Sequence, residues 1–387
     1  MKAIVILAFA AVIVATPASA EVLRVPSQYP AIQDAINAAA DADIIIVAPG
    51  TYGMDINFAG KNVVLISEQG PWPTIIDGAG GGNSIRFCGG EGRGAIISGF
   101  TIANHGAGYY GAIIAIDSSP VIANNIFRDN FSWESGAGIF IEGGAPAVIN
   151  NIFYHNEAWM TEACSGGSGI FVEAGSPDIW NNLFSDNINA YGAGIMACAD
   201  TSRIFNNIFY HDQGQGIHAD GSEALIWQNT FVRDDFGYCM NLPDLVNNIF
   251  HQEGASGGYI DNYNFYGNAE FASGPWGPFY LSQVAAGQPT DSPGVDAGTP
   301  LNFLLGTTRT DHVADAAPHD LGYHFPLRLP PTIARSLPRP LPLIPLHQLW
   351  EGNVPLAAHS FPSYSSHSSY LSFSRKMYLT AGCVSDR

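Results

Sequence analysis

The chain has 387 residues and a formal net charge of −19 at pH 7. The acidity is concentrated between residues 21 and 325, where 8 Lys and Arg stand against 32 Asp and Glu. This balance excludes nucleic acid as a ligand, because binding to phosphates needs clustered Lys and Arg. It also disfavours an anionic polysaccharide, unless bound divalent cations reverse the sign of the local field.

The first 20 residues have the pattern of a secretory signal peptide. Lys2 supplies the positive start, residues 3–14 are apolar, and Ala18-Ser19-Ala20 is a small-x-small cleavage site. The apolar run is short for a membrane span, and a retained N-terminal anchor is the alternative. No later segment is apolar for long enough to span a bilayer. We therefore expect a secreted or cell-surface protein that is not transmembrane.

Residues 21–60 are predicted to form an N-terminal cap. A short strand at 22–25 precedes a helix over about 30–40, in which apolar residues recur on one face. A buried strand at 44–47 and a turn at 49–52 follow. A helix in this place closes the open end of a solenoid.

Two short motifs then recur in step, most clearly between residues 96 and 250. Neither unit contains a helical stretch, and a single unit cannot bury its own apolar face, so the units must stack. Stacked strands lie roughly 4.8 Å apart, which places identical residues in ladders. The alternative is an antiparallel sandwich with chance repeats. The first motif, Asn-Asn-(Ile/Leu)-Phe, occurs at 124–127, 150–153, 181–184, 206–209 and 247–250; the second, Gly-x-Gly-Ile, occurs at 136–139, 167–170, 192–195 and 214–217.

These repeats resemble those of the pectin-lyase-like superfamily, whose members are right-handed parallel β-helices. The opening segments 29–36 and 44–52 are similar to the start of many such exported proteins. Ser292-Pro293-Gly294-Val295-Asp296 and Asp320-Leu321-Gly322-Tyr323-His324 are similar to the closing segment of bacterial surface β-helix proteins. The resemblance implies one all-β domain over 21–325, a single-stranded right-handed parallel β-helix, with closing coils at 251–325.

Residues 326–387 lose the repeat and become rich in Pro, Ser and Leu, with six Arg and Lys against two acids. We interpret this tail as disordered, and as either an anchor or a read-through end. The five cysteines are odd in number and lack a metal-type spacing, so no pairing is predicted. They are Cys88, Cys164, Cys198, Cys239 and Cys383.

Alignment of the units predicts an acidic column on one outer face. Side chains alternate along a strand, so Ile139 and Ile141 point inward while Phe140 and Glu142 point outward. The carboxylates of the column are candidate catalytic groups of a retaining glycosidase, or ligands of Ca²⁺. The alternative is a solvated turn position that favours acids. The first outward column contains Ala115, Phe140, Phe171, Met196 and His218; the second contains Asp117, Glu142, Glu173, Cys198 and Asp220.

Within these columns, Asp117, Glu142 and Glu173 are the leading catalytic candidates. His218 and Asp220 are weaker ones, with His218 as a possible base that is more often a plain surface residue. Phe140 and Phe171 would stack on sugar faces. No cofactor is required by any of these roles. The acids that follow the Phe of each repeat, Asp129, Asp186, Asp212 and Asp234, are interpreted as structural turn residues.

A second candidate surface lies in the loops before each Gly-x-Gly, where insertions on one face of a solenoid build binding sites. Aromatic side chains beside carboxylates suit neutral or cationic glycans. The alternative is that the aromatics pack over the coils as loop anchors. The loop residues are Trp133, Glu134, Glu157, Trp159, Glu162 and Tyr191.

Two functions remain open from the sequence. The first is a secreted or cell-surface module, expected as a monomer, that binds a polysaccharide or another partner without catalysis. The second is a polysaccharide hydrolase or lyase that uses the carboxylates of the outer face. The segments expected of pectin methylesterases, polygalacturonases and pectate lyases cannot be placed in this sequence, which favours the first.

Overall fold

The structure is a computed structural model that describes residues 20–106, 108–160, 164–198, 200–238, 243–251, 255, 260–274, 277–299, 307–311, 313–314 and 320–324. The predicted signal peptide up to residue 19 and the predicted tail lie outside the described residues, as do Cys239, Cys383 and Glu162.

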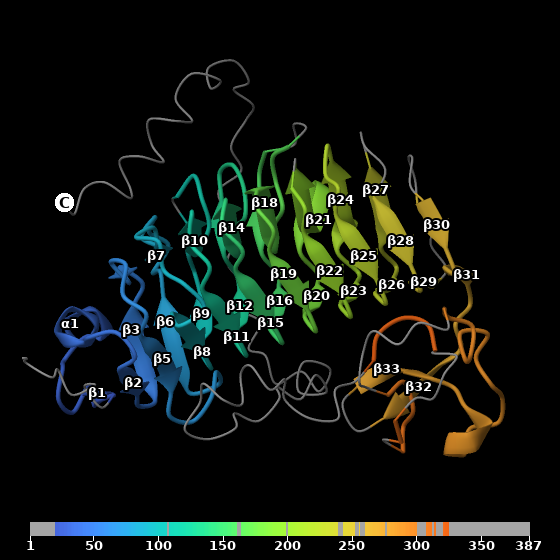
Figure 1. Cartoon of the computed structure of the whole chain (residues 1–387), viewed down its shortest axis with the longest axis horizontal. Coiled ribbons are helices and arrows are strands. Elements are labelled where there is room, and N and C mark those ends of the chain that lie inside the picture. Colours follow the sequence, from blue (N-terminus) through green and yellow to red (C-terminus); the bar gives the residue numbers. More distant parts are fainter. Residues whose placement is uncertain are drawn as a thin grey trace, which may run out of the picture.

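Three parallel sheets run side by side along the molecule (Figure 1). Sheet A contains β1 (Val22–Val25), β2 (Ile44–Val47), β5 (Val64–Ser67), β8 (Ile96–Ser98), β11 (Val121–Ala123), β15 (Ala147–Ile149), β19 (Asp178–Trp180), β22 (Arg203–Phe205), β25 (Leu225–Trp227), β28 (Asp244–Val246) and β30 (Ile260–Asn262). Sheet B contains β3 (Gly50–Gly53), β6 (Thr74–Asp77), β9 (Thr101–Ala103), β12 (Ile126–Arg128), β16 (Ile152–Tyr154), β20 (Leu183–Ser185), β23 (Ile208–Tyr210), β26 (Thr230–Val232), β29 (Ile249–His251) and β31 (Phe265–Gly267). Sheet C contains β4 (Ile56–Asn57), β7 (Ile85–Phe87), β10 (Ile113–Ile116), β14 (Ile139–Glu142), β18 (Ile170–Ala174), β21 (Ile188–Cys198), β24 (Gln213–Asp220), β27 (Asp235–Tyr238), β13 (Phe131–Ser132) and β17 (Glu157–Ala158).

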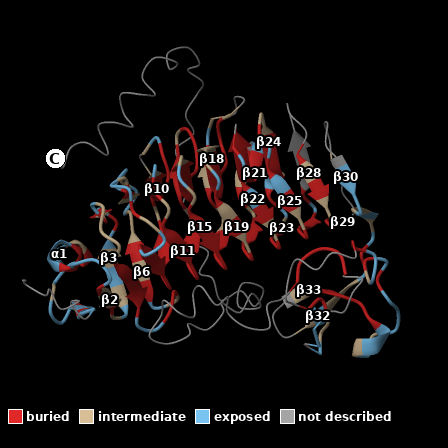
Figure 2. Ribbon diagram, viewed as in Figure 1, coloured by how far each residue is buried: buried red, intermediate tan, exposed pale blue. Residues whose placement is uncertain are grey.

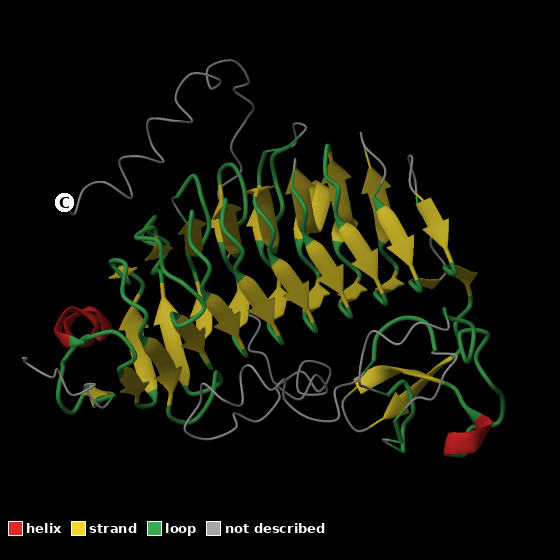
Figure 3. Ribbon diagram, viewed as in Figure 1, coloured by secondary structure: helices red, strands yellow, loops and turns green. Residues whose placement is uncertain are grey.

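Successive coils of the chain contribute strands to the three sheets in turn, so strands of one sheet pair with those of the preceding and following coils (Figure 3). The predicted motifs set the register: Ile126 pairs with Ile152, and Ile152 pairs with Leu183. The fold is the predicted right-handed parallel β-helix.

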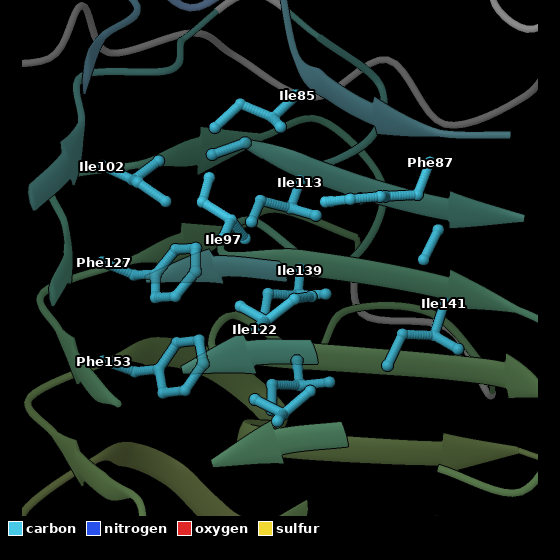
Figure 4. Close-up of a cluster of buried hydrophobic side chains, with 14 of the residues drawn as sticks. Ile85, Phe87, Ile97, Ile102, Ile113, Ile122, Phe127, Ile139, Ile141 and Phe153 are labelled. Atoms are coloured by element: carbon cyan, nitrogen blue, oxygen red, sulfur yellow. The ribbon is translucent and has the colours of Figure 1, made fainter. Parts of the chain in front are cut away.

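The phenylalanines of the first motif form a continuous stack in the bore. Neighbouring rings lie 4.6–4.9 Å apart and within 10° of parallel from Phe127 to Tyr266. Isoleucines such as Ile113, Ile122 and Ile139 fill the rest of the bore (Figure 4), which is buried along the solenoid (Figure 2). Burial of each of these side chains contributes about 1.5–3 kcal/mol, so the stacked side chains of the repeats stabilise the solenoid.

The second Asn of the motif forms an internal ladder. The amide of Asn125 donates to Oδ1 of Asn151 at 3.2 Å, and that of Asn151 donates to Asn182 at 3.1 Å. The series continues through Asn207, Asn229, Asn248 and Asn264. Each rung also satisfies backbone groups at the turn between sheets A and B, as buried polar groups require.

The N-terminal end is covered by a helix, as predicted, although α1 (Ile32–Ala38) is shorter than the expected 30–40. Ile32, Ala35 and Ile36 are buried against the first coil. Neither α1 nor any other helix among the described residues is long and apolar enough to cross a membrane.

The C-terminal part departs from the predicted closing coils. After β31 the described chain leaves the solenoid and forms an antiparallel hairpin of β32 (Phe271–Gly274) and β33 (Gly277–Leu281), followed by the 3-10 helix η1 (Val284–Ala286). Phe279 and Tyr280 pack on the outer side of sheet B with Ile152 and Leu183. The two strands of the hairpin satisfy each other's backbone N–H and C=O groups, so they need no further coil to pair with.

The closing motif at 320–324 returns along the coils instead. The amide of Gly322 donates to the carbonyl of Asn247 at 2.9 Å, and the hydroxyl of Tyr323 donates to Oδ1 of Asn181 at 2.7 Å. The backbone oxygen of His324 accepts from the Asn206 amide at 2.8 Å. This segment therefore ties several coils together from outside.

Candidate functional site

The structure breaks the predicted acidic column at Asp117. Glu142 pairs with Ile116, and Phe140 pairs with Ile114 where Ala115 was predicted. Asp117 follows the end of β10, is exposed and has a positive φ of 47°, so it is a turn residue. The predicted alignment was one residue out of register, because this coil lacks the Gly-x-Gly that anchors the others, and β10 pairs residue for residue with β14 from Ile113 with Ile139 onward.

A bulge separates the other two candidate acids. Between β14 and β18, Ile141 pairs with Val172 but Glu142 pairs with Ala174, which leaves Glu173 at the irregularity. Both glutamates are half-buried, and Oε2 of Glu173 is a buried oxygen without a hydrogen-bond partner. The register therefore does not set the two carboxylates directly opposite each other as a retaining glycosidase pair would require.

Phe140 and Phe171 cannot stack on a sugar in this structure. Both point away from the bore as predicted, and their rings stack at 5.5 Å, but both side chains are fully buried. The loop residue Tyr110 covers them, with its ring centroid 4.4 Å from that of Phe140. The alternation of side chains along a strand predicts their outward direction correctly. It does not predict that loops pack on them.

His218 and Asp220 lie in the predicted columns, opposite Met196 and Cys198. His218 is buried under the loops: its Nδ1 lies 2.5 Å from Oε1 of Gln215, and the ring of Tyr191 meets it at 5.4 Å. Burial lowers the pKa of His218, and the charge of Asp220 opposes this shift. A covered imidazole in this position is poorly placed to act as a general base toward a polysaccharide.

In the loops of the second candidate surface, two of the predicted aromatic side chains lie in contact. Trp133 and Trp159 lie one coil apart, with ring centroids at 5.3 Å and rings at 82°. Trp159 is 45% exposed, Tyr191 38% and Tyr109 40%. We call the loop residues Tyr109, Trp133, Trp159 and Tyr191 the aromatic ridge.

Backbone hydrogen bonds hold the loops of the aromatic ridge in sequence. The amide of Trp133 donates to the carbonyl of Gly108, and the amide of Trp159 donates to that of Ser132 at 3.0 Å. The side chain of Asn189 donates to the carbonyls of Ala158 and Met160, both at 2.8 Å, beside Tyr191. The aromatics therefore stand on loops fixed by the solenoid.

The carboxylates near the ridge differ in their surroundings. Glu134 is buried, while Glu157 is half-buried at the start of the Trp159 loop. Burial raises the pKa of Glu157, and the charge of His155 opposes the shift. Glu162 lies outside the described residues.

A sulfur cluster near the ridge was not predicted from the sequence. Met196 and Cys198 lie two residues apart on β21, pack with Tyr110, Phe140 and Phe171, and are contacted by Cys164 from the long loop. Neither cysteine forms a disulfide, whereas Cys88 does. The Cys164 thiol hydrogen bonds to Cys198, and this contact and burial raise the pKa of Cys198. The signal that was available was the place of Met196 and Cys198 in the two outward columns.

Across the described ranges, no three or more His, Cys, Asp and Glu side chains are grouped so that they could hold a metal ion. The Ca²⁺ site suggested for Asp117, Glu142 and Glu173 therefore has no preformed geometry. Calcium binding stays a prediction.

The parallel coils and the outward loops define the class of the protein as a β-helix with a loop-built face. Residues 37–269 match the model of the family described as "Periplasmic copper-binding protein (NosD)", so the chain belongs to the NosD family. No curated protein matches the chain.

Two solved structures are similar to it. An alginate lyase from Paenibacillus sp. str. FPU-7 is 15% identical, with a TM-score of 0.46 over 64% of this chain and 99% of that chain. A mutant of the PL6 family alginate lyase AlyGC is 16% identical, with a TM-score of 0.27 over 69% of this chain and 56% of that chain. Similarity at this level carries no argument about activity.

Proposed function

We propose that this NosD family protein is exported and binds neutral or amino-sugar polysaccharides along the aromatic ridge. The observation that carries the proposal is the contact between the half-buried Trp133 and the exposed Trp159, which brings aromatic side chains of successive coils together on one face. Exposed aromatic side chains that are grouped on one face often mark a binding surface, and fixed loops on a rigid scaffold are common binding sites.

The spacing of the ridge suits a linear polymer. Successive coils are separated by about 4.8 Å, so the ridge repeats at the scale of a sugar ring. Aromatic rings combine a large apolar face with little side-chain entropy to lose on binding. Three exposed members, Tyr109, Trp159 and Tyr191, come from three different loops, so a chain lying along the axis would meet them in turn.

The negative charge around the aromatic ridge favours neutral or cationic glycans over anionic ones. Between residues 101 and 200 the sequence contains one Arg, Arg128, and ten Asp and Glu. An anionic polysaccharide would be repelled by this surface, whereas neutral hydroxyls or protonated amines would find acceptors there. The buried pair Phe140 and Phe171 and the bulge at Glu173 do not support a hydrolytic site beside the ridge.

The test is electrophoresis of the purified protein through gels that contain xylan, soluble chitosan or alginate. We expect retardation by xylan or chitosan and none by alginate. Trp159→Ala should weaken the interaction by about tenfold, because truncation of a central aromatic side chain costs more than 1 kcal/mol. Tyr263→Ala is the matched control, since Tyr263 is 57% exposed and lies away from the ridge near β31.

Unchanged migration of the wild-type protein in all gels contradicts the proposal, as does equal retardation of Trp159→Ala. Release of new reducing ends or of unsaturated sugars from the retarding polymer would show catalysis instead of binding alone.

Copper binding is a second candidate function, because the family description names it. One observation favours it: the side chains of Cys164, Met196 and Cys198 belong to one apolar cluster on the outer side of sheet C. Thiolates and thioethers are the donors that select Cu(I), so this donor set fits that ion.

A further inference from the structure

We propose that residues 325–334, which lie outside the described residues, bind along the outer face of sheet A and cover its apolar side chains. This face is distinct from the aromatic ridge, whose loops join strands of sheet C, so the contact and glycan binding can be tested separately. Most of the segment falls in the predicted tail. Three observations support the contact: the burial of sheet A, the course of residues 320–324 and the composition of the segment.

The outer side of sheet A is covered over only part of its length. All three residues of β8, β11 and β15 are buried (Figure 2), although side chains alternate and one side of each strand faces away from the bore. In β22 and β25, further along the same sheet, only the middle residue is buried. An outward side chain is removed from water only where something packs on it, so the earlier strands have a cover that the later ones lack.

Among the described residues, no apolar side chain from outside sheet A joins the cluster on this face. Arg93 reaches over the border with sheet C and pairs with Asp178 at 3.1 Å. Ala123 and Ile149, which are 0% and 4% exposed, lie two residues further along their strands, roughly 6–7 Å nearer to sheet B. That side of the face therefore needs a cover of its own.

Residues 320–324 lead the chain to this side. The amide of His324 donates to the side chain of Asn206, whereas Gly322, two residues before it, donates to the carbonyl of Asn247, two coils further along the solenoid. The chain thus runs along the turn between sheets A and B toward the N-terminal coils. The residues that follow next reach the coil of β19, where the apolar cluster of sheet A begins.

The length of the segment matches the face. Six strand steps of roughly 4.8 Å separate β22 from β2, which is about 29 Å in total. A polyproline II chain rises about 3.1 Å per residue, so about nine or ten residues cover this distance. Prolines at 326, 330 and 331 favour this extended form, and they lack the N–H group that burial on an apolar face would leave unpaired.

The side chains of the segment fit the face in polarity and charge. Phe325, Leu327, Leu329 and Ile333 supply apolar groups, and no Asp or Glu occurs between residues 325 and 350. Arg328 adds a positive charge beside an acidic domain, so the two attract each other over a longer range. Apolar contact and charge therefore favour the same placement.

Limited proteolysis of the full chain with trypsin tests the contact. Cleavage after Arg328 should be about tenfold slower than cleavage after Arg375, which lies beyond the proposed contact. Ile149→Asp should remove this protection, because it places a charge under the segment, and it should leave the cleavage rate after Arg375 unchanged. Leu225→Asp is the matched control, since Leu225 lies on the outer side of the same sheet but is 37% exposed. Circular dichroism checks that each variant is folded.

A photo-crosslink reports the same contact with sheet A unchanged, and it decides the matter if Ile149→Asp does not fold. p-Benzoylphenylalanine in place of Leu329 should crosslink to peptides that contain β8, β11 or β15. Equal cleavage after Arg328 and Arg375 in the wild-type chain, or protection that persists in folded Ile149→Asp, would contradict the proposal. Crosslinks only to the loops of the aromatic ridge or to a second copy of the chain would also overturn it.

Discussion

The Asn187 side-chain amide donates a 2.8 Å hydrogen bond to Oδ1 of Asp212 in the next coil. Asp212 thereby takes the place that asparagine fills at Asn130 and Asn156 in earlier coils of a second internal ladder. An asparagine there would donate onward, but Oδ2 of Asp212 is buried without a partner, and Asp234 follows as the next rung. Asp212 and Asp234 therefore occupy successive rungs of this ladder where earlier coils have asparagine.

This arrangement predicts that Asp212→Asn stabilises the protein at neutral and alkaline pH. Burial raises the pKa of Asp212 to about 8. The folded state therefore keeps a proton that the unfolded chain loses, and the resulting stability is complete below about pH 4 and lost as the pH rises toward 8. We expect Asp212→Asn to gain about 2 kcal/mol at pH 8 and almost nothing at pH 4.

Urea unfolding followed by tryptophan fluorescence at pH 4, 6 and 8 measures this difference. Asp244→Asn, on the outer side of β28, is the control and should change little at any pH. A gain from Asp212→Asn that is the same at all three pH values would argue against a protonated rung.

A second position where stability should depend on pH is His155, which lies in the turn after sheet B, one coil away from Asp129. Nδ1 of His155 lies 2.9 Å from Oδ1 of Asp129, and this hydrogen bond raises the pKa of His155. The stability from the pair is present below about pH 6.5 and is lost as the pH rises through the raised pKa. His155→Asn should therefore destabilise the protein more at pH 5.5 than at pH 8.5.

An NMR titration of the His155 ring checks the cause directly. Asparagine is a suitable replacement because His155 has a positive φ of 53°, which Asn tolerates. A ring pKa at or below the ordinary histidine value in the wild-type protein would contradict this account.

Loss of one rung of the internal Asn ladder should be costly. Oδ1 of Asn182 accepts from the backbone and side-chain amides of Asn151, and its own amide donates to the carbonyl of Val148. Asn182→Ala leaves these buried groups unpaired, so we expect a loss of about 2–4 kcal/mol. Thermal unfolding monitored by circular dichroism measures it, with exposed Asn37→Ala as the control within about 0.5 kcal/mol. Equal effects of the two substitutions would show that the ladder adds no stability.

The fold could be predicted from the sequence because its main determinant is local and repeated. Each copy of Asn-Asn-(Ile/Leu)-Phe supplies an internal amide and a bore phenylalanine, as Asn182 and Phe184 do. Stacking then leaves few other registers. The departure after β31 was not predictable in this way, since residues 271–281 follow no repeat and pair as a hairpin.

The candidate site could be predicted only in part, because the repeat and the side-chain alternation describe the strands but not the loops and bulges between them. Period-two alternation correctly sent Phe140 and Phe171 outward, but nothing in it describes the loop with Tyr110 that buries them. The bulge at Glu173 cannot be predicted from alternation within one strand, because it is a change in the pairing register between β14 and β18. The pairing of Trp133 with Trp159 was predictable because both follow the repeat by the same number of residues.

The measurement that tests the proposed glycan-binding surface most directly is the affinity of chito-oligosaccharides of increasing length by titration calorimetry. The ridge spans three coil steps of about 4.8 Å, so we predict that affinity rises with each added sugar until the chain spans the ridge, and then levels off. Trp159→Ala should flatten this rise. Affinity that is independent of length, or a rise that persists unchanged in Trp159→Ala, would contradict binding along the aromatic ridge.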